Sequence, residues 1–171
     1  MPLSLPIAIL TISDTRTLAT DRSGQYLVDA VTQAGHTVSD RQLVQDNRYA
    51  IRAIVSQWIA DPAIQVILTT GGTGITPRDT TPEALRPLFD QELPGFGELF
   101  RWLSYAEIGN ATLQSRAVGG LANGTLLFCL PGSTGACRTA WEKILQSQLH
   151  SETTPCNFVT VLLSPNQHHP L

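Results

Sequence analysis

The chain has 171 residues, of which 42% are hydrophobic and 15% are charged, and its formal net charge is −3. This length and composition are typical of one compact domain with a sizeable core, and they argue against a disordered chain. No basic stripe is present, which argues against a nucleic-acid partner. Lys143 is the only lysine, so almost all positive charges are arginines, which suit fork-like contacts to phosphate or carboxylate.

The cysteines and the chain ends indicate a compartment. Cys129, Cys137 and Cys156 are odd in number and form no CxxC pair, so neither a disulfide framework nor a zinc site is supported. The start of the chain lacks the features of a signal peptide, and no apolar run reaches the length of a membrane span. We therefore expect a cytoplasmic protein with no membrane partner. One domain is expected over residues 1–164, followed by a flexible tail over 165–171 that carries two adjacent histidines.

The first part of the chain alternates between strand and helix patterns. Short apolar or β-rich runs predict three strands, over residues 6–13, 36–44 and 64–70. Ser23 would cap a helix that ends at Gly35. Asp46 precedes a second helix, in which apolar residues from Ile51 to Ile59 recur at helical spacing.

A long polar loop then leads to a third helix over residues 81–89. Thr81 followed by Pro82 fits an N-cap and first helical position, while Thr80 with Glu83 would fit a capping box one residue earlier. Pro94 opens a fourth helix.

The last part of the chain predicts a hairpin and a helix. Asn123 and Gly124 favour a tight turn between two β-rich runs within residues 115–131. Ser133 would cap the last helix. The complete order predicts an α/β fold: a three-layer, doubly wound, mostly parallel sheet with helices on both faces and a small antiparallel hairpin.

In such a sheet, ligands bind beyond the carboxyl ends of the strands. Four segments that directly follow predicted strands are rich in hydroxyl groups, carboxylates or glycine, and they cover residues 13–16, 45–48, 71–79 and 131–134. Because parallel strands end at the same edge, these segments predict one site.

The third segment resembles a phosphate-binding loop. Gly71, Gly72 and Gly74 would let backbone N–H groups turn towards a phosphate, and the hydroxyl groups of Thr70 and Thr73 add donors. The loop is not a Walker A loop, because no Gly-Lys-Ser/Thr follows. The alternative is that this segment is only a glycine-rich turn before a capped helix. On the motif alone, this alternative is favoured over phosphate binding by roughly two to one.

Two carboxylates, those of Asp46 and Asp79, would lie at the same edge. They could hold a hard cation such as Mg²⁺ against substrate phosphates, with Asp14 as a third candidate. The alternatives are that Asp46 is a plain N-cap and Asp79 an ordinary loop residue. Arg78 would either neutralise phosphate charge or remain solvated.

Ser133 would add an anion site at the start of the last helix. The residues offer no Ser/His/Asp or Cys/His nucleophile arrangement. On their own they support an anion- or nucleotide-binding α/β protein with metal-assisted phosphoryl chemistry, and they do not name its substrate.

Five stretches, in their order and spacing, resemble the molybdopterin-binding (MoaB/MogA) family: ILTISD, LTTGGTGITPRDTTPEA, PGFGELFRWLS, LQSRAVGG and LPGST. The resemblance covers nearly the whole chain. NRYAIRA and PGST bring it closest to the MoaB branch, beside MogA and the G domain of gephyrin.

This resemblance implies a doubly wound homotrimer or a hexamer built from two trimers. It also implies a molybdopterin adenylyltransferase, in which the terminal phosphate of molybdopterin attacks the α-phosphate of ATP with Mg²⁺ and releases pyrophosphate. Hand-over of the product to a molybdate-inserting enzyme would follow. The alternatives are a non-catalytic molybdopterin carrier and a flavodoxin-like nucleotide module unrelated to pterins.

The resemblance also implies site residues. It places the two functional aspartates, which would also be the metal ligands, at Asp46 and Asp79. The nucleotide phosphates would be bound by Ser13, Asp14, Thr70, Gly71, Gly72, Thr73 and Gly74. The molybdopterin would be bound by Ser115, Arg116, Pro131, Gly132 and Ser133.

Overall fold

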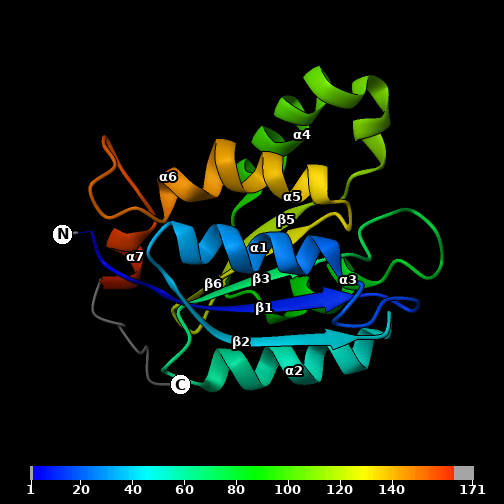
Figure 1. Cartoon of the computed structure of the whole chain (residues 1–171), viewed down its shortest axis with the longest axis horizontal. Coiled ribbons are helices and arrows are strands. Elements are labelled where there is room, and N and C mark those ends of the chain that lie inside the picture. Colours follow the sequence, from blue (N-terminus) through cyan, green and yellow to red (C-terminus); the bar gives the residue numbers. More distant parts are fainter. Residues whose placement is uncertain (1, 164–171) are drawn as a thin grey trace.

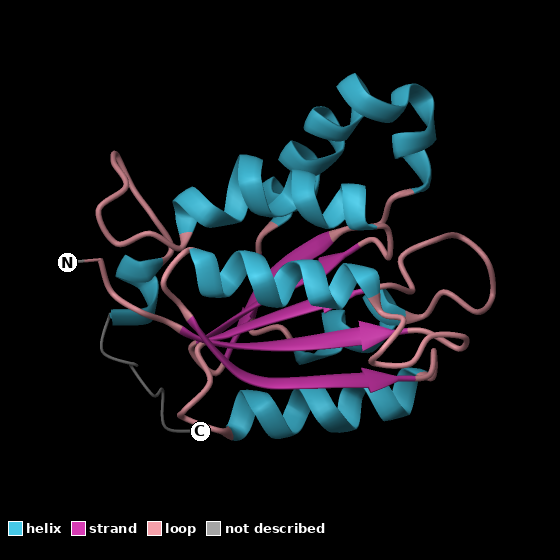
Figure 2. Ribbon diagram, viewed as in Figure 1, coloured by secondary structure: helices cyan, strands magenta, loops and turns pink. Residues whose placement is uncertain are grey.

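The computed structural model describes residues 2–163 and places a six-stranded sheet at the centre of the molecule (Figures 1 and 2). The strands are β1 Pro6–Ile12, β2 Thr37–Val44, β3 Val66–Thr70, β4 Gln91–Glu92, β5 Val118–Ala122 and β6 Thr125–Leu130. Their order is β2-β1-β3-β6-β5-β4; β2, β1, β3 and β6 run parallel, while β5 is antiparallel to both of its neighbours. The predicted doubly wound, mostly parallel sheet is confirmed.

Helices cover both faces of the sheet (Figure 1). One face carries α1 Arg22–Gln33, α4 Pro94–Ile108 and α5 Thr134–Ala140, and the other carries α2 Arg48–Ala60 and α3 Thr81–Leu85. Shorter segments complete the described chain: η1 Arg86–Leu88, η2 Gly109–Gln114, the π-helical turn Trp141–Leu145, α6 Gln146–Gln148 and α7 Val159–Leu163.

The two hydrophobic cores explain why the strands read as continuous apolar runs. Along β1, Ile7 and Ile9 pack into the core under α1, while Ala8 and Leu10 pack into the core under α2. Successive side chains of a strand point to opposite faces, so a strand buried on both faces needs an apolar residue at every position.

The predicted hairpin forms at the expected turn. Asn123 has φ 48° and Gly124 has φ 76°, and this pair of left-handed residues is the two-residue turn that joins β5 to β6. The helix expected over residues 81–89 is shorter: α3 ends at Leu85 and continues as a 3₁₀ turn, because Pro87 lacks the N–H that a longer helix needs.

The predicted cap at Ser23 and the alternative cap at Asp46 were wrong, and the N-cap of α3 lies at Thr80, the alternative position, instead of Thr81. Asp21, not Ser23, caps α1, and Asn47, not Asp46, caps α2 by accepting from the N–H groups of Tyr49 and Ala50 at 3.0 Å each. Thr80 stands at the N-cap of α3 in place of Thr81, but its side chain makes no capping bond.

The alternative capping box between Thr80 and Glu83 is absent as well, because Glu83 pairs with Arg116. The cap at Ser133 is confirmed, since its Oγ accepts from the N–H of Ala136 at 3.1 Å.

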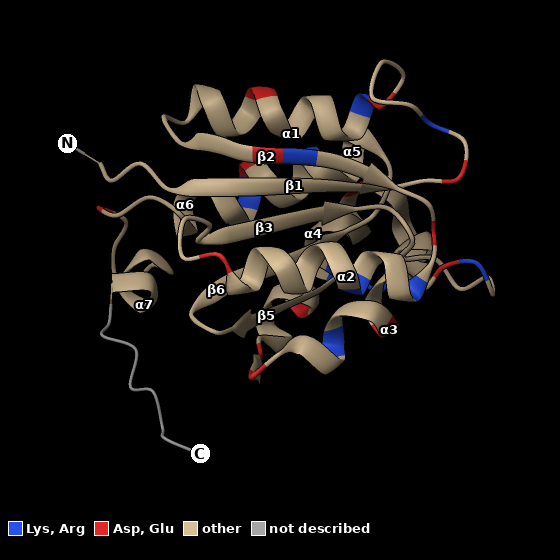
Figure 3. Ribbon diagram, turned by 90° about the horizontal axis from the view of Figure 1, so that it is seen from below, with Lys and Arg blue, Asp and Glu red and all other residues tan. Residues whose placement is uncertain are grey.

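Acidic and basic residues are scattered over helices, loops and strand β2 (Figure 3). Within residues 2–163, no helix is long and apolar enough to cross a membrane. The expected tail at 165–171, with its two histidines, lies outside the described residues.

Candidate functional site at the carboxyl edge of the sheet

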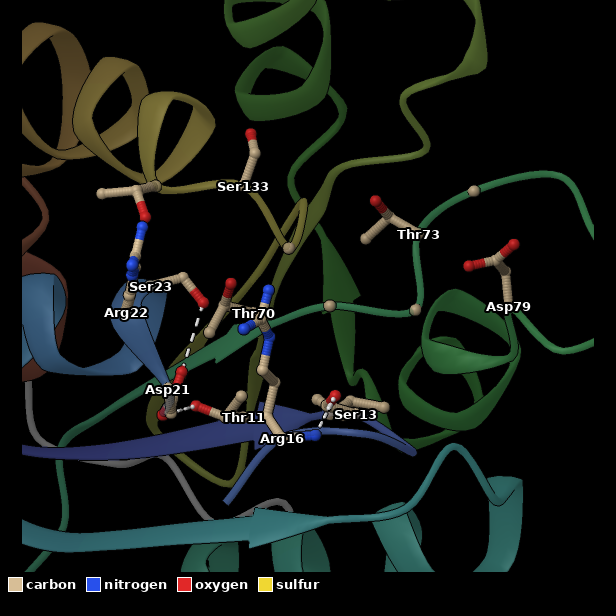
Figure 4. A pocket seen from close by; sticks show the side chains of 16 residues that line it. Thr11, Ser13, Arg16, Asp21, Arg22, Ser23, Thr70, Thr73, Asp79 and Ser133 are labelled. Atoms are coloured by element: carbon tan, nitrogen blue, oxygen red, sulfur yellow. Dashed lines mark hydrogen bonds between the residues drawn. The ribbon is translucent and has the colours of Figure 1, made fainter. Parts of the chain in front are cut away.

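A polar pocket of about 510 Å³ lies at the carboxyl ends of β1, β3 and β6 (Figure 4). Its walls include the ends of β1 and β3, which flank the point where the chain reverses its winding direction through the sheet. Three of the four segments predicted to converge there, over residues 13–16, 71–79 and 131–134, contribute lining residues. The fourth, over residues 45–48, lies behind the loop Thr70–Gly74 and lines no part of this pocket.

The glycines of the loop are required by close approach. Gly71 has φ 108°, and a Cβ built there would lie 2.1 Å from the carbonyl oxygen of Ile12. The carbonyl groups of Gly71 and Gly72 accept hydrogen bonds from the hydroxyl and N–H of Thr81, at 2.9 and 3.1 Å. In a planar peptide the N–H points opposite to the carbonyl, so the N–H groups of Gly72 and Thr73 point away from α3.

Asp79 stands at one side of this loop and lines the pocket (Figure 4). Its Oδ2 accepts from the N–H and the hydroxyl of Thr76, at 3.0 and 2.6 Å. Burial alone would raise the pKa of Asp79, but hydrogen bonds from Thr76 and Gly74 and the charge of Arg116 outweigh it and hold that pKa below its ordinary value. The carboxyl group is therefore ionised at neutral pH.

Asp46 lies on the other side of the same loop. Its Oδ1 accepts two hydrogen bonds from Thr80, the residue that follows Asp79. Its Oδ2 faces Gly72, where a built Cβ would lie only 2.7 Å away. The two predicted carboxylates thus border one loop from different sides, Asp46 at Gly72 and Asp79 at Gly74, and of the two only Asp79 lines the pocket.

Asp14 joins the first loop to this group. Its Oδ1 accepts from the N–H of Asp46 at 3.2 Å, and its Oδ2 accepts from Nε and Nη2 of Arg78 at 3.0 and 2.5 Å. The hydrogen bond from Arg78 lowers the pKa of Asp14. Arg78 is therefore paired with a carboxylate in this structure, although its side chain remains 73% exposed.

Ser115 and Arg116, expected on the substrate side, have different surroundings. Arg116 lines neither the polar pocket nor the smaller pocket described below. Its Nε donates to the carbonyl of Gly74 and its Nη2 donates to the carbonyl of Asp79, each at 2.8 Å, and its Nη1 forms an ion pair with Glu83. It braces the loop that carries Asp79. Ser115 has a buried Oγ without a hydrogen-bond partner and lines a second pocket.

This second pocket has a volume of about 180 Å³, and its walls include Phe100, Ile108 and Ala136. It adjoins the polar pocket at the turn after β6, because Pro131 lines the small pocket, Gly132 lines the large one, and Ser133 lines both.

Sequence reasoning missed five residues of the polar pocket: Thr11, Ile12, Asp21, Arg22 and Ser23. Asp21 is only 3% exposed and accepts from the hydroxyl of Thr11 at 2.6 Å. The only signal in the sequence was Gly24 inside the predicted first helix, where in the structure a built Cβ would lie 2.0 Å from the Asp21 carboxylate. Nothing in the sequence distinguished Arg22 from a solvated arginine.

Asp79 gives the pocket one hard oxygen donor of the kind that Mg²⁺ prefers in proteins, and Asp46 borders the same loop from behind. In the described part of the chain, no three His, Cys, Asp or Glu side chains gather into a complete metal cage. The carboxylates of Asp46 and Asp79 are hard oxygen donors, and Mg²⁺ is usually held by one or two carboxylates while phosphates and water supply the remaining ligands.

A doubly wound sheet with a polar pocket at its carboxyl edge defines a class of α/β ligand-binding protein. The family described as "Probable molybdopterin binding domain" matches residues 8–151. The chain therefore belongs to the molybdopterin-binding family, as its motifs predicted.

Known relatives agree with the MoaB branch. The chain is 61% identical over 152 residues to molybdenum cofactor biosynthesis protein B of Escherichia coli (strain K12), covering 89% of each chain. A crystal structure of a molybdenum cofactor biosynthesis protein B superimposes with a TM-score of 0.85 at 45% identity, over 87% of this chain and 93% of that one. The tungsten cofactor synthesizing protein MoaB from Pyrococcus furiosus gives 0.74 at 36% identity, over 84% and 92%.

Proposed function

We propose that this chain binds molybdopterin and adenylylates it with ATP and Mg²⁺, as a step of molybdenum cofactor biosynthesis. A terminal phosphate oxygen of molybdopterin forms a bond to the α-phosphorus of ATP. The bond from that phosphorus to the β-phosphate bridging oxygen breaks, and its electron pair leaves with pyrophosphate. The products are adenylyl-molybdopterin and pyrophosphate. Membership of the family supports the role in cofactor biosynthesis.

The observation that carries this proposal is the pair of adjoining pockets. The larger is polar and is bordered by an inward-turned glycine loop, while the smaller has apolar walls. A substrate with a flat heteroaromatic ring and a terminal phosphate fits such a pair, because the ring favours apolar walls and the phosphate favours N–H donors and cations. The pockets meet at Ser133, so a single ligand can occupy both.

Different residues bind the nucleotide phosphates and the metal ion. The N–H groups of Gly72 and Thr73 and the hydroxyl groups of Thr73 and Ser13 bind the nucleotide phosphates. The Thr70 hydroxyl and the Gly71 N–H already donate to the carbonyls of Pro131 and Leu130, so Thr70, Gly71 and Gly74 shape the loop, and Asp14 acts through its ion pair with Arg78. Asp46 and Asp79 hold Mg²⁺, which when bound neutralises phosphate charge.

Molybdopterin contacts fall to the small pocket and the turn after β6. Ser115 supplies a buried hydroxyl without another partner, and Pro131, Gly132 and Ser133 form the ridge between the two pockets. Arg116 acts indirectly on this side, by bracing the loop that carries Asp79.

No side-chain nucleophile is needed for this reaction. The attacking group is the phosphate of the substrate, which is already ionised, so the protein has to position two anions and neutralise their charge. A rigid loop with fixed N–H groups does this without reorganising during the reaction.

Self-association accompanies this function in the proposal, as a trimer or hexamer. Helix α4 supports it, because Trp102, Tyr105 and Ile108 expose 72%, 58% and 55% of their surface. Sedimentation velocity would measure the assembly, and a monomer at micromolar concentration would contradict this part of the proposal. Hand-over of the adenylate to a molybdate-inserting enzyme would be the next step.

The test is pyrophosphate release. The full chain should release pyrophosphate from ATP when molybdopterin and Mg²⁺ are both present, and omission of either should abolish the release. Binding of molybdopterin with ATP left intact would overturn the transferase and identify a carrier. Failure to bind molybdopterin at all would overturn both.

A further inference from the structure

Two arginines without a role of their own assigned from the sequence line the polar pocket, Arg16 within a predicted site segment and Arg22 outside every such segment. Arg16 lies in the loop after β1, and Arg22 is the first residue of α1. In Figure 4, Arg22 lies on the opposite side of the pocket from Asp79, and Arg16 rises between Ser13 and Thr70. The pocket therefore has a cationic side and an anionic side.

Neither guanidinium group is neutralised by the protein. Within residues 2–163, Arg16 and Arg22 form no ion pair, whereas Arg78 pairs with Asp14 and Arg41 pairs with Asp21. The carboxylate next to Arg22 in the sequence is that of Asp21, and it is already engaged by Thr11, Gly24 and Arg41. Two guanidinium groups without a counter-ion at one pocket favour an anionic ligand.

Both arginines start from anchored backbone. The Oγ of Ser13 accepts from the N–H groups of Thr15 and Arg16, at 3.3 and 3.1 Å, which fixes the turn that carries Arg16. Arg22 follows the buried cap of α1, where Asp21 accepts from the N–H of Gly24 at 2.9 Å. The backbone positions of both arginines are fixed before a ligand binds, which limits the conformational entropy lost on binding.

The cationic and anionic sides of the pocket predict the orientation of a bound polyphosphate. Asp79 repels phosphate unless a metal ion intervenes, so the metal-bound phosphates belong beside Asp79. The phosphate groups of the nucleotide that lie further from the metal ion then reach the side of the pocket that Arg16 and Arg22 line. Arginine binds phosphate through two parallel N–H donors, which gives both affinity and orientation.

We infer that Arg16 and Arg22 clamp the β- and γ-phosphates of ATP, which become the pyrophosphate leaving group. This inference rests on the proposed function. As the bond between the α-phosphorus and the bridging oxygen breaks, the electron pair stays on that oxygen and the leaving group gains negative charge. The two guanidinium groups stabilise that charge, and they hold pyrophosphate after the transfer.

Binding of pyrophosphate and AMP tests the clamp without molybdopterin. Isothermal titration calorimetry with Mg²⁺ would compare the full-length wild-type protein with Arg16→Gln, Arg22→Gln and the double variant. Each single change should weaken pyrophosphate binding on the order of 10-fold to 100-fold, and the double variant should lose more than either. AMP lacks both phosphates and should bind all four proteins alike.

Arg138→Gln is the matched control. Arg138 lies on α5, is 59% exposed and pairs with Glu142 outside the polar pocket, so this variant should bind pyrophosphate like the wild type. Thermal unfolding of each variant at the wild-type temperature establishes that the loss is local.

Wild-type pyrophosphate affinity in the double variant, or an equal loss of AMP affinity, would overturn the clamp while leaving the proposed function standing. A wild-type protein that binds neither ATP nor pyrophosphate would instead overturn the proposed function, and the clamp with it.

Discussion

The Oδ1 of Asp46 accepts two hydrogen bonds from Thr80, from its N–H at 3.2 Å and from its hydroxyl at 2.7 Å. This pair ties the loop after β2 to the first turn of α3, and Thr80 is the neighbour of Asp79. The orientation of one predicted metal ligand is therefore coupled to the position of the other. A carboxylate held by two donors is also restricted to one rotamer, which preorganises its remaining oxygen.

Thr80→Val should test this coupling, because valine keeps the shape of threonine and removes the hydroxyl donor. We expect a loss of about 1–3 kcal/mol in unfolding free energy, typical of a lost hydrogen bond to a charged group, and weaker Mg²⁺-dependent ATP binding. Urea unfolding and calorimetry measure the two effects. Thr80→Ser retains the hydroxyl and is the matched control, so equal losses in both variants would contradict the coupling.

Asp79→Asn should abolish pyrophosphate release while the protein stays folded and assembled. Asparagine has nearly the same shape and can still accept from Thr76, but it removes the charge that a magnesium ion requires. Turnover with molybdopterin and ATP is the measurement, and sedimentation checks the assembly. Asp29→Asn, on the exposed surface of α1, should retain activity; wild-type rates in Asp79→Asn would refute the role.

The position of the site could be predicted from the sequence because it follows from backbone geometry. Continuous apolar runs marked β1 and β3, Asn123-Gly124 marked the hairpin, and parallel strands must end at one edge. Polar residues that follow those strands therefore had to converge, whatever their exact contacts.

The details could not be predicted where neighbouring residues compete for one role. Asp46 and Asn47 are both good N-caps, and only the register of α2 gives the cap to Asn47 and frees Asp46 for Thr80. Asp21 and Ser23 compete in the same way at α1. Arg116 gave no local sign of bracing the loop at Gly74, because that contact joins residues 42 positions apart.

Gly74→Ala should disturb Mg²⁺-dependent binding with little effect on the fold. A Cβ at this position would lie 2.6 Å from Oδ2 of Asp79, so that carboxylate must move, whereas the backbone at Gly74 is not in the left-handed region. Weaker ATP binding by calorimetry is expected. Gly95→Ala is the control, because its Cβ meets nothing within 4 Å. Unchanged ATP affinity in Gly74→Ala would count against the role of Asp79.

Asp21→Ala should destabilise the protein strongly. The Asp21 side chain is 1% exposed and pairs with Arg41 at 3.2 Å, and removing it leaves a largely buried guanidinium group whose Nε already lacks a partner. Breaking such a pair costs about 3–5 kcal/mol, and the hydrogen bonds to Thr11 and Gly24 are lost with it. Urea unfolding at fixed protein concentration measures the change. Asp29→Ala, at an exposed site, should differ from wild type by less than about 0.5 kcal/mol.

The contribution of Asp79 to stability should depend on pH in one direction. Its folded-state pKa lies below the unfolded value of 3.8, so ionised Asp79 stabilises the fold above that value, and this stabilisation is lost as the pH falls through the folded-state pKa. The unfolding free energy of the wild type should exceed that of Asp79→Asn by a constant amount near neutral pH. The difference should shrink below about pH 4.

Urea unfolding of both proteins across the acid range provides the measurement. A difference that stays constant to the lowest pH, or that grows on acidification, would mean that the hydrogen bonds of Thr76 do not favour the ionised carboxylate. Because Asp79 remains ionised far below neutrality, Mg²⁺-dependent ATP binding should also persist to about pH 5.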